Sequence, residues 1–335
     1  MSAAMRGQGT RPRVGFLGVG WIGRNRLEAL VRSEQVQVVG ISDPSPDAAR
    51  EALALVPGAA CVASLEALLE LGLDGLVIAT PSAVHAEQSL RALERGVAVF
   101  CQKPLGRTAG EVRRVVDAAR AADRLLGVDL SYRFTTGMQR IRERLQAGAL
   151  GHVYAVSLVF HNAYGPDKPW FYDPRLAGGG CVMDLGIHLV DLALWGLGFP
   201  DVKSVTCQRF SQGRPLGSRE EAVEDYAAAQ LALGTGTAVQ LACSWKLPAG
   251  CDAVIEAAFY GTQGGAALRN VQGSFYDFTA DVFQGTRRER LSEPPDAWGG
   301  RAAVAWATRL ARGERFDAEA EQLVEVAATL DRLYG

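Results

Sequence analysis

Short apolar runs alternate with segments of helical spacing over the first 130 residues. The apolar runs predict buried strands at 13–17, 36–41, 75–79, 97–101 and 125–130. Between them, apolar positions recur three and four residues apart, which predicts helices at 24–32, 82–95 and 108–120. Strands that alternate with amphipathic helices form a parallel sheet covered on both faces. The pattern therefore predicts a doubly wound α/β domain over residues 13–130, preceded by a flexible arm at 1–12.

The hydrophobic pattern changes after about residue 130, where strands become the dominant prediction. A helix at 137–146 leads to a long strand at 151–162 and then to a polar loop at 163–177. Further strands are predicted at 202–210, 224–233, 237–244 and 253–260, with a hairpin turn at 234–236. We therefore expect a second domain over residues 131–335, built on an open, mostly antiparallel sheet. Its last helix, at about 317–334, could pack back on the first domain.

The first predicted strand runs into a Gly-x-Gly-x-x-Gly motif formed by Gly18, Gly20 and Gly23. The first glycine permits a tight turn, the second lets the backbone approach a pyrophosphate, and the third allows close helix packing. Asp43 follows the second strand, where a carboxylate accepts hydrogen bonds from the adenosine ribose hydroxyls and repels a 2'-phosphate. The motif predicts NAD as the cofactor, with NADP disfavoured. A turn before Pro44 explains Asp43 equally well and is compatible with this role.

Two other loops should open on the same carboxyl edge of the sheet, because the strands are parallel. One follows the strand at 75–79 and the other contains Lys103, one of only four lysines in the chain. A lysine amine can be tuned toward neutrality, whereas an arginine cannot, although an ordinary solvated or phosphate-pairing lysine is the alternative. The predicted cofactor-binding residues are Gly18, Gly20, Trp21, Ile22, Gly23, Asp43, Thr80, Pro81, Gln102 and Lys103.

An apolar segment entered through three glycines carries Asp184, His188 and Asp191. At about 3.6 residues per turn these three share one helical face. An imidazole titrates near neutrality, and a carboxylate four residues earlier can hold the ring, so the pair could take a proton from a substrate hydroxyl. Two alternatives to this proton-accepting pair are a core histidine that is hydrogen-bonded to an aspartate and half of a metal site. We predict no metal, because borderline cations usually require more nitrogen or sulfur ligands.

Composition narrows the class of protein further. A chain of 335 residues, 48% of them hydrophobic, is long enough for two domains. Its formal net charge of -2 gives no electrostatic footprint for nucleic acid or an acidic membrane. No apolar run is long enough to span a bilayer, no signal peptide is evident, and the six cysteines lack Cys-x-x-Cys spacing. We expect a cytoplasmic protein with reduced thiols.

Together these segments resemble the family of glucose-fructose oxidoreductase, inositol dehydrogenase and the rhizopine catabolism protein, over nearly the whole chain. The resemblance is carried by the glycine motif, Asp43, Thr80-Pro81 with His85, Gln102-Lys103-Pro104, Tyr132-Arg133-Phe134 and the segment 178–191. It implies an N-terminal Rossmann domain, a C-terminal sheet domain that supplies the substrate pocket and often an oligomer interface, and pyridine-nucleotide oxidoreduction of sugars or cyclitols. It also implies that Lys103, Asp184 and His188 are catalytic and allows a cis Lys103–Pro104 bond.

The leading hypothesis is hydride transfer between NAD and a secondary alcohol or ketone of a sugar, cyclitol or sugar derivative. His188 would accept the hydroxyl proton, Asp184 would orient the imidazole or bind a neighbouring hydroxyl, and Lys103 would donate a hydrogen bond to the developing alkoxide. Polar and aromatic residues expected to form the substrate pocket with Asp184 and His188 are Tyr132, Arg133, His161, Tyr164, Asp167, Lys168 and Trp170. The predicted partner is a small polyol, and we expect a homo-oligomer, a dimer or a tetramer.

Two alternatives keep the nucleotide but change the outcome. One is glycoside cleavage or dehydration through transient oxidation and elimination, with no net consumption of NAD. The other is a non-catalytic dinucleotide-binding sensor. The family has a glutamate before its lysine, whereas this chain has Gln102, and this departure is the best support for the sensor.

Overall fold

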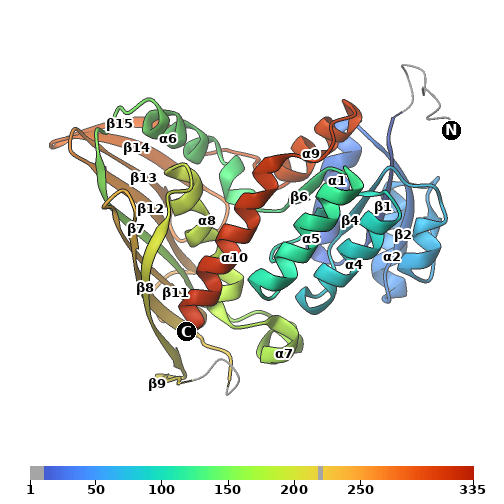
Figure 1. Ribbon diagram of the computed structural model, residues 1–335, viewed down its shortest axis with the longest axis horizontal. Helices are drawn as coiled ribbons and strands as arrows, with labels where there is room; N and C mark the ends of the chain where they lie inside the picture. The colour runs from blue at the N-terminus through green and yellow to red at the C-terminus, as the bar shows by residue number, and fades with distance from the viewer. Residues whose placement is uncertain (1–10, 218–221) are drawn as a thin grey trace.

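The computed structural model describes residues 11–217 and 222–335. Within these ranges the strands form a six-stranded sheet and a nine-stranded sheet, which lie at opposite ends of the molecule in Figure 1. Most of the predicted arm at 1–12 lies outside the described residues. The fold class inferred from the hydrophobic pattern, a parallel sheet followed by a mostly antiparallel one, is confirmed.

The six-stranded sheet is entirely parallel and has the strand order β3-β2-β1-β4-β5-β6. Its strands are β1 (Arg13–Leu17), β2 (Gln37–Ser42), β3 (Ala60–Cys61), β4 (Gly75–Ile78), β5 (Ala98–Cys101) and β6 (Leu126–Val128). The connecting helices are α1 (Trp21–Ser33), α2 (Pro46–Leu55), α3 (Leu65–Leu69), α4 (Ser82–Glu94) and α5 (Ala109–Ala122). The order reverses beside β1, and the loops at such a reversal form the ligand-binding crevice of this kind of sheet.

The nine-stranded sheet has the order β15-β14-β13-β12-β7-β11-β10-β8-β9 and is antiparallel except where β11 pairs with β7. Its strands are β7 (Val153–Asn162), β8 (Val202–Ser211), β9 (Arg214–Pro215), β10 (Tyr226–Leu233), β11 (Ala238–Ser244), β12 (Ala253–Gly261), β13 (Gly265–Asn270), β14 (Phe278–Gln284) and β15 (Arg287–Ser292). The predicted hairpin turn at 234–236 joins β10 to β11. Sequence reasoning did not assign β13, β14 and β15, which extend the sheet beyond β12.

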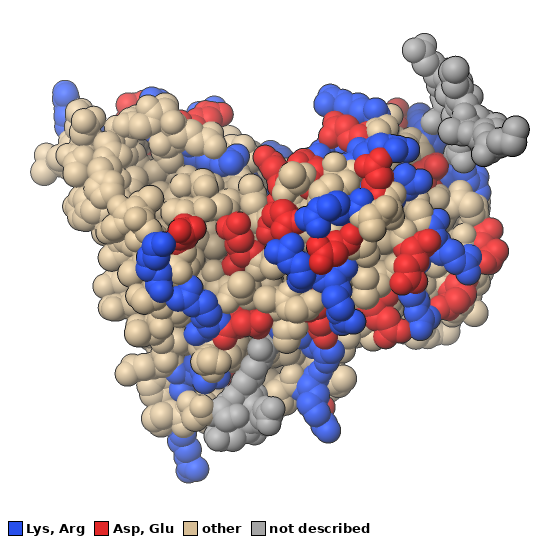
Figure 2. Space-filling model, in the orientation of Figure 1, with Lys and Arg blue, Asp and Glu red and all other residues tan. Residues whose placement is uncertain are grey.

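Small, uncharged side chains fill the centre of the outer face of this sheet. They are Ala155, Ser157, Val159, Ala228, Gln230, Ala232, Ala238, Gln240 and Ala242, which are paired with one another across β7, β10 and β11. Figure 2 shows few charged side chains along the side of the molecule where this sheet lies, in contrast to the dense charges over the Rossmann domain. The outer face is therefore poorly suited to remain in water over its whole area.

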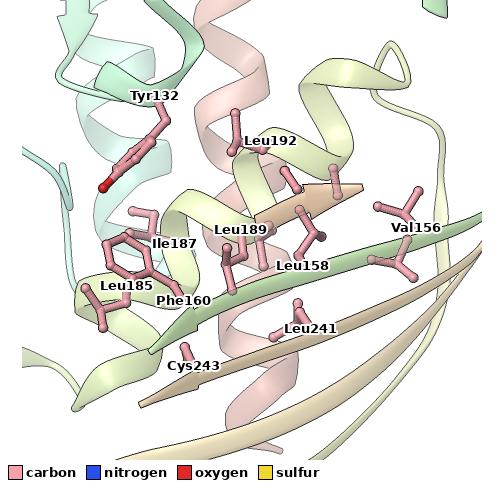
Figure 3. Packing of buried hydrophobic residues seen from close by; sticks show 14 of the residues in the cluster. Tyr132, Val156, Leu158, Phe160, Leu185, Ile187, Leu189, Leu192, Leu241 and Cys243 are labelled. Carbon is pink, nitrogen blue, oxygen red and sulfur yellow. The ribbon is translucent and has the colours of Figure 1, made fainter. Parts of the chain in front are cut away.

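The inner face of the sheet packs on helix α8 (Ile187–Gly196), which is buried on every side. Figure 3 shows Leu189 and Leu192 of this helix facing Val156 and Leu158 of β7, with Leu241 of β11 beside them. A helix that is apolar all round belongs in the middle of a core. The helical segment 174–196 is long and apolar enough to cross a membrane by composition, but 89% of its apolar window is buried inside the protein.

Two helices from the end of the chain, α9 (Arg301–Ala311) and α10 (Glu321–Tyr334), return to the first domain. The other α-helices of the described residues that have not yet been named are α6 (Thr136–Gln146) and α7 (Pro174–Ala177). Helix α10, which covers most of the predicted 317–334 helix, lies between α5 and α8 in Figure 1. Helix α9, which sequence reasoning left within the second domain, packs beside α1. Its Trp306 covers Gly75 and Gly127, where an added Cβ would lie 2.7 and 2.9 Å from the indole ring.

Candidate active site

A cavity of about 1360 Å³ lies along the carboxyl edge of the parallel sheet and extends to the entrance of α8. It exceeds the roughly 1000 Å³ of a large drug-sized pocket, which leaves room for a dinucleotide and a second small molecule. Most of the predicted cofactor residues line it: Gly18, Gly20, Trp21, Ile22, Asp43, Thr80, Pro81, Gln102 and Lys103. Of the predicted substrate residues, Tyr132, Asp167, Lys168, Trp170, Asp184 and His188 line it.

The three glycines of the motif have different steric roles, and all three agree with a bound pyrophosphate. Gly18 has a φ of +87°, and a Cβ there would lie 2.5 Å from the backbone oxygen of Ala79. A Cβ on Gly23 would lie 2.3 Å from the oxygen of Gly18, which explains why this glycine packs against the turn and does not line the cavity. Gly20 has open space where its Cβ would be, and no side chain caps the helix that follows it. A phosphate can therefore approach the first turn of α1 closely.

Asp43 lies at the end of β2, where the adenosine ribose of a dinucleotide is held in this fold. Its Oδ2 accepts a hydrogen bond from the backbone N–H of Val19 at 2.7 Å, and Oδ1 accepts one from the N–H of Ser45 at 2.8 Å. The carboxylate therefore orders the glycine turn as well as the turn after β2. Asp43 thus orders a turn and also lines the cavity, and its contact with the adenosine ribose stays a prediction.

The loops after β4 and β5 are joined by His85, which is almost fully buried. One ring nitrogen lies 2.7 Å from the backbone oxygen of Thr80, and the other lies 2.7 Å from that of Pro104. The Lys103–Pro104 peptide bond is cis. His85 thus connects the loop that follows β4 with the loop that carries Lys103.

Lys103 contacts the beginning of the second domain directly. Its Nζ donates hydrogen bonds to Asp184 Oδ1 at 2.6 Å and to the backbone oxygen of Asp184 at 2.7 Å. The other carboxylate oxygen, Oδ2, accepts a hydrogen bond from the indole N–H of Trp245 at 3.1 Å. An ammonium group has three donors, so one N–H of Lys103 has no acceptor within the described part of the chain. That donor is available to a substrate oxygen in the cavity.

The segment before α8 departs from the regular helix that we expected. Residues Val182–Gly186 form a π-helix, and residue 187 begins the α-helix. Among the described residues no hydrogen bond joins Asp184 to His188, because the aspartate is fully engaged with Lys103 and Trp245. The expectation that Asp184 orients the imidazole was therefore wrong. π-turns inside helices are frequent at functional sites, where they redirect side chains.

The last of the three glycines before this segment packs against Glu224, which is buried behind it. Glu224 Oε1 accepts hydrogen bonds from the backbone N–H groups of Gly180 and Val182 and from the hydroxyl of Tyr334 in α10. A Cβ on Gly180 would lie 2.0 Å from the Glu224 backbone oxygen. The C-terminal helix thus helps to fix the beginning of the segment that carries Asp184.

His188 lies on the cavity wall with a buried Nδ1 that has no hydrogen-bond partner among the described residues. Burial lowers the pKa of His188 well below its usual value, and the positive charges of Lys103 and Arg26 act in the same direction. We had expected a carboxylate to stabilise the charged imidazole, but the neighbouring charges are positive. His188 is therefore neutral near pH 7 and can act as a proton acceptor.

Three predicted substrate residues, Arg133, His161 and Tyr164, do not line the cavity. Arg133 forms a buried ion pair with Asp191 through its Nε and Nη2 atoms, and its guanidinium lies over the Trp195 ring. His161 follows Phe160 on β7, so strand alternation directs it to the outer face of the sheet, where its Nδ1 lies 2.7 Å from Ser244 Oγ. Tyr164, whose hydroxyl donates a hydrogen bond to Asp252 Oδ1, also lies outside the cavity lining.

An aromatic wall lies beside His188 in the cavity. The Tyr132 ring lies 4.8 Å from the His188 ring and 5.0 Å from the Trp298 ring, measured between centroids. Burial raises the pKa of the Tyr132 phenol, so it remains protonated. Trp170 stacks on Phe171 at 3.8 Å on the same cavity. Such faces suit the C–H side of a sugar ring.

Sequence reasoning missed three residues that matter here: Arg26, Asp129 and Trp245. Arg26 and Asp129 line the cavity, and Trp245 holds Asp184. Asp129 follows an apolar strand, and the rule that singled out Asp43 could have found it. Arg26 and Trp245 gave no local signal, because only the folded chain brings them to the site.

Two family models match most of the chain. Residues 12–130 match the oxidoreductase family with an NAD-binding Rossmann fold, and residues 138–267 match the GFO/IDH/MocA C-terminal domain. The chain belongs to the GFO/IDH/MocA family. The resemblance inferred from the sequence motifs is confirmed.

Two curated relatives and one solved structure are similar to this chain. A D-glucoside 3-dehydrogenase of Escherichia coli (strain K12) is 31% identical over 60% of this chain and 60% of its own length. An inositol 2-dehydrogenase of Rhizobium meliloti (strain 1021) is 28% identical over 77% of this chain and 76% of its own. The solved structure of GenD2 from gentamicin A biosynthesis in complex with NAD has a TM-score of 0.81 at 24% identity, covering 100% and 96% of the two chains. The match to the glucoside dehydrogenase spans less than two thirds of that enzyme, and the likeness to GenD2 concerns the fold.

Proposed function

We propose that this protein is an NAD-dependent oxidoreductase acting on a secondary alcohol or ketone of a sugar, cyclitol or sugar derivative. The observation that carries the proposal is the convergence of Lys103 and His188 on one cavity that also contains the glycine motif. The named activities of the two curated relatives, on a glucoside and on inositol, support a polyol substrate. The aromatic wall of the cavity agrees with a ligand that has a ring with a C–H face.

The residues divide the work as their contacts suggest. In the oxidising direction the neutral imidazole of His188 accepts the proton of the substrate hydroxyl. The remaining N–H of Lys103 donates a hydrogen bond to the oxygen as negative charge develops on it. Asp184 holds the ammonium in place and Trp245 holds Asp184, so the aspartate is a positioning residue. NAD, held by the glycine motif and Asp43, would supply the redox chemistry of the reaction.

A substrate scan tests the proposal. Free sugars, inositols, glycosides and nucleotide sugars are each incubated with NAD and with NADP, while NADH absorbance and product mass are followed. A rise in absorbance matched by a product two hydrogens lighter is the expected result. Product without accumulating NADH would instead support redox-assisted elimination, and tight NADH binding with no product from any compound would support a sensor.

The Asp43 carboxylate is expected to set the preference for NAD. In the variant Asp43→Asn the negative charge is lost, so the ratio of the NADPH to the NADH dissociation constant should fall by about tenfold. Fluorescence titration of both reduced nucleotides measures it. Asp47→Asn, an exposed change on the first turn of α2, is the matched control and should leave the ratio unchanged. Equal ratios in the two variants would remove Asp43 from the specificity of the site.

We further propose that the protein forms a homo-oligomer in the cytoplasm through the outer face of the nine-stranded sheet. Light scattering coupled to size exclusion should give a multiple of 35.8 kDa. Ala242→Arg places a charge at the centre of this face and should shift the mass toward the monomer, since an unpaired charge is costly in an interface. Ala147→Glu, on the exposed end of α6, should not. A monomeric unmodified protein would contradict the proposal.

A further inference from the structure

Asp129, the residue immediately after β6, has one carboxylate oxygen that no described group satisfies. The side chain is almost fully buried, and Oδ2 accepts hydrogen bonds from Arg26 Nε at 2.6 Å and from the Gln102 amide. Oδ1 is buried and has no hydrogen-bond partner among the residues that the structure describes. All three residues line the cavity. The structure therefore contains a built acceptor, with its counter-charge, at the edge of the ligand site.

Gln102 is chemically matched to the Asp129 carboxylate. An amide can donate to Asp129, whereas a second carboxylate at that position would face the first one at hydrogen-bond distance. Gln102 and Asp129 follow the neighbouring strands β5 and β6, and Arg26 of α1 balances the charge of the Asp129 carboxylate. Gln102 thus supplies a hydrogen-bond donor to the buried Asp129 carboxylate.

The strand order indicates which part of a dinucleotide lies beside Asp129. The glycine turn for the pyrophosphate follows β1, and Asp43 for the adenosine ribose follows β2. β5 and β6 lie on the other side of β1 from β2. The loops at their ends, including the one that carries Lys103, therefore face the nicotinamide half of the dinucleotide. The hydrogen-bond donors of that half are the ribose hydroxyls and the carboxamide amine.

We propose that Asp129 Oδ1 accepts a hydrogen bond from the nicotinamide half of NAD, and that the Arg26–Asp129–Gln102 cluster is a cofactor-binding element. The proposal rests on the NAD-dependent function proposed above. An ionised oxygen buried without a donor is unfavourable, and a ligand donor placed against it makes a strong, charge-assisted contact. Cofactor binding therefore satisfies a group that the protein alone leaves unsatisfied.

The variant Asp129→Asn tests this contact. With the amide oxygen retained toward Arg26 and Gln102, the NH₂ group replaces Oδ1, so an acceptor becomes a donor of the same size. The dissociation constant for NADH, measured by fluorescence titration, should rise by about tenfold or more. The dissociation constant for ADP, measured by calorimetry, should stay within about twofold, because ADP lacks the nicotinamide half. Intact ADP binding also verifies that the variant is folded.

The control variant is Asp117→Asn, the same change on the exposed surface of α5, which should alter neither constant. NADH affinity in Asp129→Asn equal to that of the unmodified protein would overturn the proposal and leave the proposed function standing. A change only in the KM of the sugar would also overturn it. An unmodified protein that does not bind NADH would overturn both.

A crystal structure of the unmodified protein with NADH gives a second measurement that does not depend on any variant. Asp129 Oδ1 within about 3.2 Å of a ribose hydroxyl or of the carboxamide nitrogen is the expected result. A nearest cofactor donor beyond hydrogen-bond distance would contradict the proposal.

Discussion

Lys103→Ala should reduce turnover by about two orders of magnitude or more while leaving NADH affinity within about threefold. The ammonium is held by two hydrogen bonds to Asp184, and its remaining donor is directed at the substrate oxygen in our mechanism. A contact made mainly as charge develops on that oxygen stabilises the transition state more than the bound cofactor. Steady-state kinetics with the substrate found in the scan, and fluorescence titration with NADH, measure the two quantities.

Lys203→Ala provides the matched control for this variant. Lys203 is exposed on β8, where it pairs with Asp201, and its loss should change neither turnover nor NADH affinity. Turnover within about threefold of the unmodified protein in Lys103→Ala would exclude the lysine from the chemistry. A comparable fall in both variants would indicate a general loss of folded protein.

His188→Gln should lower the rate of substrate oxidation by about 100-fold or more, because an amide cannot accept the hydroxyl proton. The pH dependence adds a sharper criterion. Burial, Lys103 and Arg26 all lower the pKa of His188, so the neutral form that accepts a proton persists below the ordinary histidine value of about 6.5. Oxidation by the unmodified protein should therefore stay constant through pH 6.5 and decline only at lower pH, where the imidazole becomes protonated.

In the glutamine variant this decline at low pH should disappear, since the residual activity no longer depends on an imidazole. The matched control is His152→Gln, at an exposed position just before β7, which should keep both the rate and the pH profile. A decline centred at or above pH 6.5 in the unmodified protein would contradict the assignment of a buried, neutral His188 as the base.

Much of the fold could be predicted because its signals are local. The buried strands of the parallel sheet are short apolar runs, and their ends carry the glycine turn, Asp43 and Lys103, which the chain's alternation brings to one edge. β13 to β15 escaped prediction because arginine, aspartate and glutamine interrupt their apolar pattern, as in Arg287–Ser292. The sequence did not show that helix α9 packs on α1 of the first domain, because this packing depends on contacts between distant segments.

The sequence predicted which residues form the site better than it predicted the contacts between them. Helical spacing put Asp184 and His188 one turn apart, and that spacing alone favoured their pairing. Lys103 is 81 residues from Asp184 in the sequence, and only the folded structure reveals that the lysine amine donates a hydrogen bond to the aspartate carboxylate. The same holds for Arg26, whose charge reaches His188 across the domain boundary. The π-helix at 182–186 begins beside Glu224, whose side chain accepts hydrogen bonds from the backbone N–H groups of Gly180 and Val182. A one-dimensional pattern does not contain these contacts.

The position of Trp306 affects how members of this family could be recombined. The indole of Trp306 packs on the nucleotide-binding half, although it follows the entire nine-stranded sheet in the sequence. It leaves no room for a Cβ at Gly75 and Gly127, the two glycines beneath it. A chimera cut near residue 130 would pair one parent's glycines with another parent's helix. Exchanges of cofactor preference between relatives should therefore transplant segment 301–311 together with the first domain.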